Sequence, residues 1–228
     1  MTPNTATFEA PEAAPKWARW PVATVLNMAD LPAGLSRITD AAVCLRKMPE
    51  TVAGWLDDQD RAGLPEGRFI LTANDVAQCV EDLFAKVGHA PSAALAWLCE
   101  DLSRQAHCLS ALDGETRLRL RVERITNNAC SKFHIDSVVS RLICTYRGPG
   151  TQIAFDQAFQ NDPLTLPTGM PILLKGKRWS QANPVQLLHR SPPIEGTGLT
   201  RFITVLEAVA EHDLIPHHDR DYHNLNSL

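Results

Sequence analysis

The spacing of apolar residues changes from a helical to an extended period near Gly114. Before this point, apolar side chains recur every three or four residues. This spacing predicts helices over 28–58, with a break at Pro49, and over 72–87 and 91–112. After it, 117–123 reads Arg-Leu-Arg-Leu-Arg-Val-Glu, a strict alternation typical of a strand with one buried face. Helices first and strands afterwards indicate an α+β protein.

The second half of the chain contains short apolar segments separated by glycine- and proline-rich turns. We expect strands over 117–123, 137–146, 151–155, 169–176, 185–189 and 199–206. Six or so such strands within about 90 residues predict a small sandwich or a jelly-roll barrel. The chain shows neither an internal repeat nor a strand–helix alternation, so we expect the helices to support one sheet of this barrel.

The expected organisation is one structural unit preceded by a tail. Residues 1–16 are rich in proline and small residues and predict a disordered tail. Residues 17–228 are expected to form a single domain, with a helical support over 17–114, a jelly-roll core over 115–208 and a polar tail over 209–228.

Composition argues against several kinds of partner. The net charge of −4 offers no basic surface for phosphate backbones, so no nucleic-acid partner is expected. No apolar run approaches the roughly 18–20 residues that span a bilayer, so no membrane partner is expected. The N-terminus lacks the features of a secretory signal, and the six cysteines form no CxxC pair. These features favour a cytoplasmic protein with reduced thiols and leave the oligomeric state open.

Three residues of the second half form a candidate metal site. In a strand, residues i and i+2 share a face, so His134 and Asp136 would project side by side. His189 ends an apolar segment predicted to be a strand. Two imidazoles and one carboxylate on one side of a metal form the facial triad of non-haem Fe(II) oxygenases. We therefore predict His134, Asp136 and His189 as metal ligands and as the catalytic centre.

An arginine follows His189 by 12 positions, inside an otherwise apolar segment. A buried arginine needs an anion to offset its desolvation. Arg201 is therefore a candidate anion-binding residue, although Glu195 or Glu207 could also pair with it.

The order His-x-Asp, His, Arg over roughly 117–207 resembles the 2-oxoglutarate- and Fe(II)-dependent dioxygenases, in particular their prolyl-hydroxylase-like branch. The resemblance implies a double-stranded β-helix (jelly roll) that binds Fe(II) and uses 2-oxoglutarate as cosubstrate. It implies that Arg201 grips the distal carboxylate of 2-oxoglutarate, with a hydrogen bond from Tyr146 or Thr145. The implied reaction is hydroxylation of an unidentified small molecule or of a peptide or protein side chain.

The phrases Phe-His-Ile-Asp at 133–136, Thr-Tyr-Arg-Gly-Pro-Gly-Thr at 145–151 and His-Arg-Ser-Pro-Pro at 189–193 also resemble an uncharacterised bacterial family, domain of unknown function 1826. Such proteins tend to be encoded near metal-handling genes. This favours an alternative function as a cupin-like metal-binding protein that is not an oxygenase and serves zinc or other metal handling. A structural or interaction module with an empty barrel is a third hypothesis.

Two further features of the sequence could indicate metal binding. Histidines 212, 217, 218 and 223 form a cluster near the C-terminus that could hold zinc or nickel, or could belong to a solvated tail. Cys130 lies close in sequence to the candidate site and could be an alternative ligand, or a small buried apolar residue.

Overall fold

The computed structural model describes residues 15–114, 117–155, 159–179 and 184–209. The predicted N-terminal tail, except for residues 15 and 16, lies outside the described residues. So does the C-terminal tail from residue 210, with its four clustered histidines. No helix in the described part of the chain is long and apolar enough to cross a membrane.

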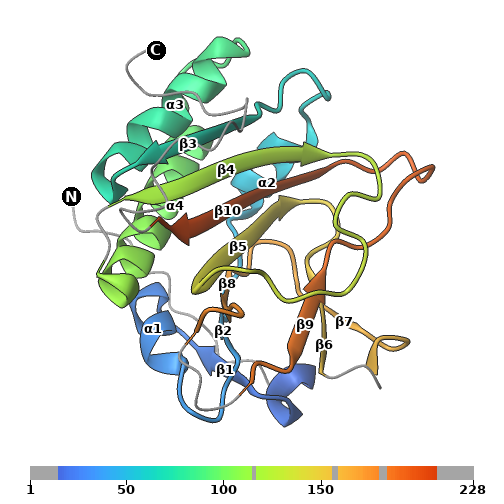
Figure 1. The fold of residues 1–228 in the computed structure, drawn as a ribbon. Helices are drawn as coiled ribbons and strands as arrows, with labels where there is room; N and C mark the ends of the chain where they lie inside the picture. The colour runs from blue at the N-terminus through green and yellow to red at the C-terminus, as the bar shows by residue number, and fades with distance from the viewer. Residues whose placement is uncertain (1–14, 115–116, 156–158, 180–183, 210–228) are drawn as a thin grey trace, which may run out of the picture.

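The described strands form two sheets that pack face to face (Figure 1). The larger sheet has the order β1-β2-β8-β5-β10-β4-β3, and the smaller has the order β7-β6-β9. The strands of the larger sheet are β1 (Val22–Val25), β2 (Ala41–Cys44), β3 (Gly67–Leu71), β4 (Leu118–Ile125), β5 (Ser140–Arg147), β8 (Ile172–Lys175) and β10 (Arg201–Ala208). Those of the smaller sheet are β6 (Gln152–Phe155), β7 (Leu164–Thr165) and β9 (Leu187–Arg190).

From β4 onward the chain passes repeatedly between the two sheets. Strands β4, β5, β8 and β10 lie in the larger sheet, whereas β6, β7 and β9 lie in the smaller one. His134, between β4 and β5, joins the smaller sheet through an antiparallel bridge to His189 of β9. Such alternation is typical of double-sheet jelly rolls.

Helices cover the outer face of the larger sheet (Figure 1). The α-helices are α1 (Leu31–Gly34), α2 (Glu50–Asp57), α3 (Val76–Lys86) and α4 (Ala93–Asp113), and the 3-10 helices are η1 (Lys16–Arg19), η2 (Met28–Asp30) and η3 (Ala73–Asp75). Helix α4 begins after Ser92, whose side chain accepts a hydrogen bond from the backbone N–H of Leu95, and ends at Gly114 in the left-handed region. The mixed helix-and-strand architecture is thus confirmed.

Alternate residues of the central strands pack into two different cores. On β10, Phe202 and Leu206 pack against the helices. Ile203 and Val205 point the other way, toward the smaller sheet, where they pack with Ile143 of β5. The strand period of two therefore divides the molecule into a helix-facing core and an inter-sheet space.

The helical region predicted over 28–58 is wrong in its first part. This part contains η2, the single turn α1 and then β2, whose four residues are all buried. A strand covered on both faces reads as a continuous apolar run, so its residues can also fit a helical spacing. Strands β1, β2 and β3 belong to the larger sheet, so residues 17–114 are not only a helical support.

Candidate metal and anion site

The three predicted metal ligands lie together between β9 and the segment that precedes β5. Nε2 of His189 lies 3.0 Å from Oδ2 of Asp136, and Nε2 of His134 lies 3.5 Å from Oδ1 of Asp136. One potential ligand atom from each residue lies within 4.8 Å of the other two. Because bonds from these ligands to a first-row metal are about 2 Å long, a single ion would need only small side-chain movements to bridge them.

Backbone contacts fix the two histidines side by side. The N–H of His134 donates to the carbonyl of His189 at 3.1 Å, and the N–H of His189 donates to the carbonyl of His134 at 3.0 Å. The centroids of the two imidazole rings are 4.5 Å apart. The bridge between the two segments therefore orients both rings toward the same space.

Asp136 is positioned by the turn that follows β8. The backbone N–H of Lys177 donates to the carbonyl of Asp136 at 2.8 Å, and that of Gly176 donates to the carbonyl of Val139 at 2.8 Å. A Cβ atom on Gly176 would lie 2.0 Å from the carbonyl oxygen of Val138, so this close packing requires a glycine.

The surroundings of the two imidazoles shift their pKa values in opposite directions. Nδ1 of His134 lies 2.8 Å from the carbonyl oxygen of Lys132, which can only accept a hydrogen bond. Nδ1 therefore carries a proton. The contact with Asp136 raises the pKa of His134, so a metal bound at Nε2 would replace the second proton that this contact favours. Burial lowers the pKa of His189, which favours its neutral form.

The carboxylate of Asp136 has one oxygen without a hydrogen bond. Oδ2 is buried, lies 3.0 Å from Nε2 of His189 and has no hydrogen-bond partner among the described residues. Oδ1 forms an ion pair with Arg141, which also pairs with Glu207. Burial alone would raise the pKa of Asp136, but the two imidazoles and Arg141 hold it well below its usual range. An ionised carboxylate that has one imidazole nitrogen beside each of its oxygens fits a divalent metal.

Arg201 is fully buried on β10, and its hydrogen-bond partners among the described residues are all neutral. Nε donates to the carbonyl of Pro149 at 2.7 Å, Nη1 to Oγ of Ser191 at 2.7 Å, and Nη2 to Oγ1 of Thr145 at 3.2 Å. Within the described ranges no carboxylate forms an ion pair with it. Burial lowers the pKa of Arg201 to about 10. Glu123 offsets part of this shift from a distance, but a desolvated guanidinium with no carboxylate in direct contact favours binding of an anion.

The turn after β5 permits this arrangement. Gly148 has φ +75°, and a Cβ atom there would lie 2.6 Å from the carbonyl oxygen of Thr200. Only glycine therefore allows the carbonyl of Pro149 to approach Arg201.

Of the two residues predicted beside Arg201, the structure places only Thr145 there. Tyr146 is the next residue on β5 and points to the opposite face. Its hydroxyl donates to Oδ2 of Asp101 at 2.6 Å and accepts from Nε2 of Gln105 at 2.6 Å, both on α4. The predicted contact of Tyr146 with 2-oxoglutarate is therefore wrong, because this side chain lies in the helix-facing core.

The network around Tyr146 gives a prediction about stability. Asp101 is fully buried and binds Arg46 through both carboxylate oxygens. Asp101→Asn leaves the Arg46 cation without its partner and should lower the free energy of unfolding by about 3 kcal/mol. The exposed pair of Glu100 and Arg104 lies on the same helix, so Glu100→Gln should cost under about 1 kcal/mol. Denaturant unfolding measures both, and equal losses would contradict this account.

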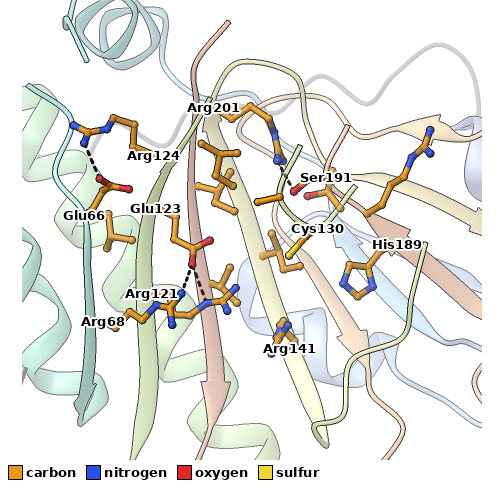
Figure 2. A pocket seen from close by; sticks show the side chains of 18 of the residues that line it. Glu66, Arg68, Arg121, Glu123, Arg124, Cys130, Arg141, His189, Ser191 and Arg201 are labelled. Atoms are coloured by element: carbon orange, nitrogen blue, oxygen red, sulfur yellow. Dashed lines mark hydrogen bonds and ion pairs between the residues drawn. The ribbon is translucent and has the colours of Figure 1, made fainter. Parts of the chain in front are cut away.

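Two of the candidate ligands, His134 and His189, line the same cavity of about 440 Å³ as Arg201 (Figure 2), whereas Asp136 lies behind them. Its apolar lining includes residues 125, 143, 203 and 205. Ser191, the residue after β9, also lines it. Sequence analysis missed this residue, although its i+2 spacing from His189 places both side chains on one side of an extended chain.

Cys130 also lines the cavity and is the exposed cysteine among the six. Its φ of 55° lies in the left-handed region, which is uncommon for a residue other than glycine. Its sulfur is not part of the group of described ligand atoms that converge on one point. The structure therefore gives no support for Cys130 as a metal ligand.

Thiol alkylation should distinguish Cys130 from the buried cysteines. Burial raises the pKa values of Cys79, Cys108 and Cys144 to about 12 each, so these thiols stay protonated and covered. We expect iodoacetamide at mildly alkaline pH to modify Cys130 in the native protein and the others only after unfolding. Mass spectrometry of tryptic peptides measures this, and native modification of Cys144 would show that the core is arranged differently.

This chain belongs to the family described as "Protein of unknown function (DUF1826)", whose model matches residues 27–207. The resemblance to that family is thus confirmed. No curated protein matches the chain.

The solved structures that are similar to this one include the following three. The dioxygenase for auxin oxidation from rice has 15% identity and a TM-score of 0.47, with 83% of each chain covered. Dioxygenase for auxin oxidation 1 from Arabidopsis thaliana, in a binary complex with 2-oxoglutarate, has 11% identity and a TM-score of 0.46 over 91% of this chain and 96% of that one. A bsmA homologue from Methylobium petroleophilum PM1 has 14% identity and a TM-score of 0.41 over 82% and 94%.

Proposed function

We propose that this protein is an Fe(II)- and 2-oxoglutarate-dependent oxygenase that hydroxylates a small molecule or a protein side chain. One observation carries the proposal. In the described part of the chain, a His-Asp-His group has one carboxylate oxygen without a hydrogen-bond partner, and the buried guanidinium of Arg201 has no carboxylate within ion-pair distance. The two histidines of the group and Arg201 line the same cavity. The His-Asp-His group suits a divalent metal, and the guanidinium suits the distal carboxylate of a dicarboxylic cosubstrate.

Each residue has a defined role in this proposal. Nε2 of His134, Nε2 of His189 and Oδ2 of Asp136 would hold Fe(II) on one face. When bound, Fe(II) and 2-oxoglutarate supply the activation of dioxygen that C–H hydroxylation requires. Arg141 keeps the Asp136 carboxylate ionised and oriented. The apolar side chains between the two sheets would exclude water from the cavity beside the metal site.

The cosubstrate would depend on Arg201. Its three neutral partners use one hydrogen bond from each guanidinium nitrogen, which fixes the plane of the group. The two η-nitrogens retain further N–H groups that could donate to one carboxylate in a bidentate manner. Thr145 would then orient the guanidinium of Arg201, in addition to any hydrogen bond of its own to the cosubstrate.

We also propose that the core predicted over 115–208 is a double-stranded β-helix on which the helices pack. The alternation of β4 to β10 between the two sheets supports this interpretation. The bridge between His134 and His189 adds the segment before β5 to the smaller sheet. In such a barrel the ligands lie at the rim of the smaller sheet and face the larger one.

The proposal is tested by thermal unfolding under anaerobic conditions, with Mn(II) as a redox-silent substitute for Fe(II) and N-oxalylglycine as an analogue of 2-oxoglutarate. Binding at a hundredfold excess over Kd stabilises the folded state by about 2.7 kcal/mol. We expect Mn(II) to raise Tm and N-oxalylglycine to raise it further. With Fe(II), 2-oxoglutarate and oxygen, slow succinate release should follow.

The cupin-like alternative gives a different result in the same experiment. A metal-handling protein would be stabilised by zinc or Mn(II) without any effect of N-oxalylglycine. That outcome, together with the absence of succinate, would overturn the oxygenase proposal.

A further inference from the structure

A second group of charged residues lines the cavity away from the His-Asp-His group. Arg68 on β3 and Arg121 on β4 are partners in the strand register. Both face the same oxygen of Glu123, at 3.6 Å from Nη2 of Arg68 and 3.4 Å from Nε of Arg121. Figure 2 shows these three side chains together, apart from His189. This wall comes from β3 and β4, whereas the ligands come from the other side of the cavity.

The charges on this wall do not balance. One carboxylate, that of Glu123, faces two guanidinium groups. Both contacts are longer than normal hydrogen bonds, and Nε of Arg121 is buried without a hydrogen-bond partner among the described residues. The neighbouring Arg124 already pairs with Glu66 at 2.7 Å. One positive charge and a buried donor are thus left facing the cavity.

The floor between this wall and the metal ligands is apolar. Arg121 pairs in register with Val205 of β10, and Val205 pairs with Ile143 of β5. These three residues share one face of the larger sheet, so the side chains of Arg121, Val205 and Ile143 form a row across β4, β10 and β5. Neighbouring strands are about 4.8 Å apart, which places Arg121 roughly 10 Å from β5. Strand β5 carries Arg141, the partner of Asp136.

The cavity is large enough for two small molecules. A cavity of about 150 Å³ holds benzene. The volume here is about 440 Å³. A cosubstrate on Arg201 would therefore leave room over Ile143, Ile203 and Val205 for a substrate.

We propose that Arg68 and Arg121 bind the carboxylate of a small organic acid whose apolar body lies over Ile143, Ile203 and Val205. This inference rests on the proposed oxygenase function and adds the class of substrate. Glu123 contacts both guanidinium groups and limits their affinity for the acid. The carboxylate on the arginine wall directs the opposite end of the substrate toward the His-Asp-His group.

The test compares phenylpropionate with its neutral amide, phenylpropionamide, by calorimetric titration of protein loaded with Mn(II) and N-oxalylglycine. We expect the acid to bind about tenfold tighter than the amide, as one charge-assisted contact implies. Arg121→Gln should remove this preference, and Arg68→Gln, at a more exposed side chain, should reduce it. Glu123→Gln should strengthen binding of the acid and leave the amide unchanged. Arg104→Gln, on the outer face of α4, is the matched control and should change neither.

Three outcomes would overturn the acid site: equal affinity for acid and amide, a preference that survives both arginine variants, or no binding of either probe. The same titrations without Mn(II) and N-oxalylglycine separate this inference from the oxygenase proposal. If the protein prefers the acid in a way that depends on Arg121 but does not bind Mn(II), the acid site is supported and the oxygenase proposal is rejected. A response to Mn(II) and N-oxalylglycine without any acid preference would reject only the site.

Discussion

His134→Ala is expected to abolish the stabilisation by Mn(II) while leaving the unliganded protein folded. The side chain of His134 is 35% exposed, and its ring contacts the carbonyl of Lys132 and the carboxylate of Asp136, so its loss removes little packing. The variant keeps two of the three ligands, and we expect its metal affinity to fall at least 100-fold. A wild-type stabilisation of about 2.7 kcal/mol would then shrink to about 0.4 kcal/mol at the same Mn(II) concentration.

The matched control is His107→Ala. His107 is an exposed histidine on α4, outside the group of converging ligand atoms. Its removal should leave the metal-dependent rise in Tm intact. A rise of equal size in the His134 and His107 variants would show that the metal binds elsewhere.

Arg201→Lys is expected to separate the cosubstrate from the metal. The lysine keeps one positive charge but loses the planar fork that can donate two parallel hydrogen bonds to a carboxylate. We expect affinity for N-oxalylglycine to fall by roughly 100-fold, about the contribution of one or two hydrogen bonds to a charged group. The Mn(II)-dependent rise in Tm should remain, because Arg201 is not one of the converging ligand residues.

Arg124→Lys serves as the control for this variant. Arg124 also lines the cavity, but it pairs with Glu66 and donates to the carbonyl of Leu64 at 3.0 Å. Its replacement should leave binding of N-oxalylglycine unchanged. If both variants lose affinity for N-oxalylglycine equally, the analogue is attracted by the general positive charge of the cavity, and Arg201 has no specific role.

The metal-ligand candidates could be predicted because their signals are local or chemically unusual. His134 and Asp136 are two positions apart, and an extended chain places such residues on one side. Arg201 is conspicuous because a charge inside an apolar strand needs a compensating partner. The structure adds what spacing does not contain: the bridge from His134 to His189, and the packing of Gly176 that positions Asp136.

Other features could not be predicted because they depend on which layer covers each face of a strand. The alternation at 117–123 indicates a charged face but does not show whether that face meets solvent or a cavity. The structure places Arg121 and Glu123 on the cavity wall. Likewise, Tyr146 and Thr145 are adjacent in sequence, and only the position of α4 shows that the tyrosine belongs to the helix-facing core.

The most direct measurement is anomalous diffraction at the manganese edge from crystals grown anaerobically with Mn(II) and 2-oxoglutarate. The account predicts one peak about 2 Å from Nε2 of His134, Nε2 of His189 and Oδ2 of Asp136. Density for a dicarboxylate should extend from that peak to Arg201. A peak at another position, or no peak in a protein whose His134 and His189 rings lie as they do here, would contradict it.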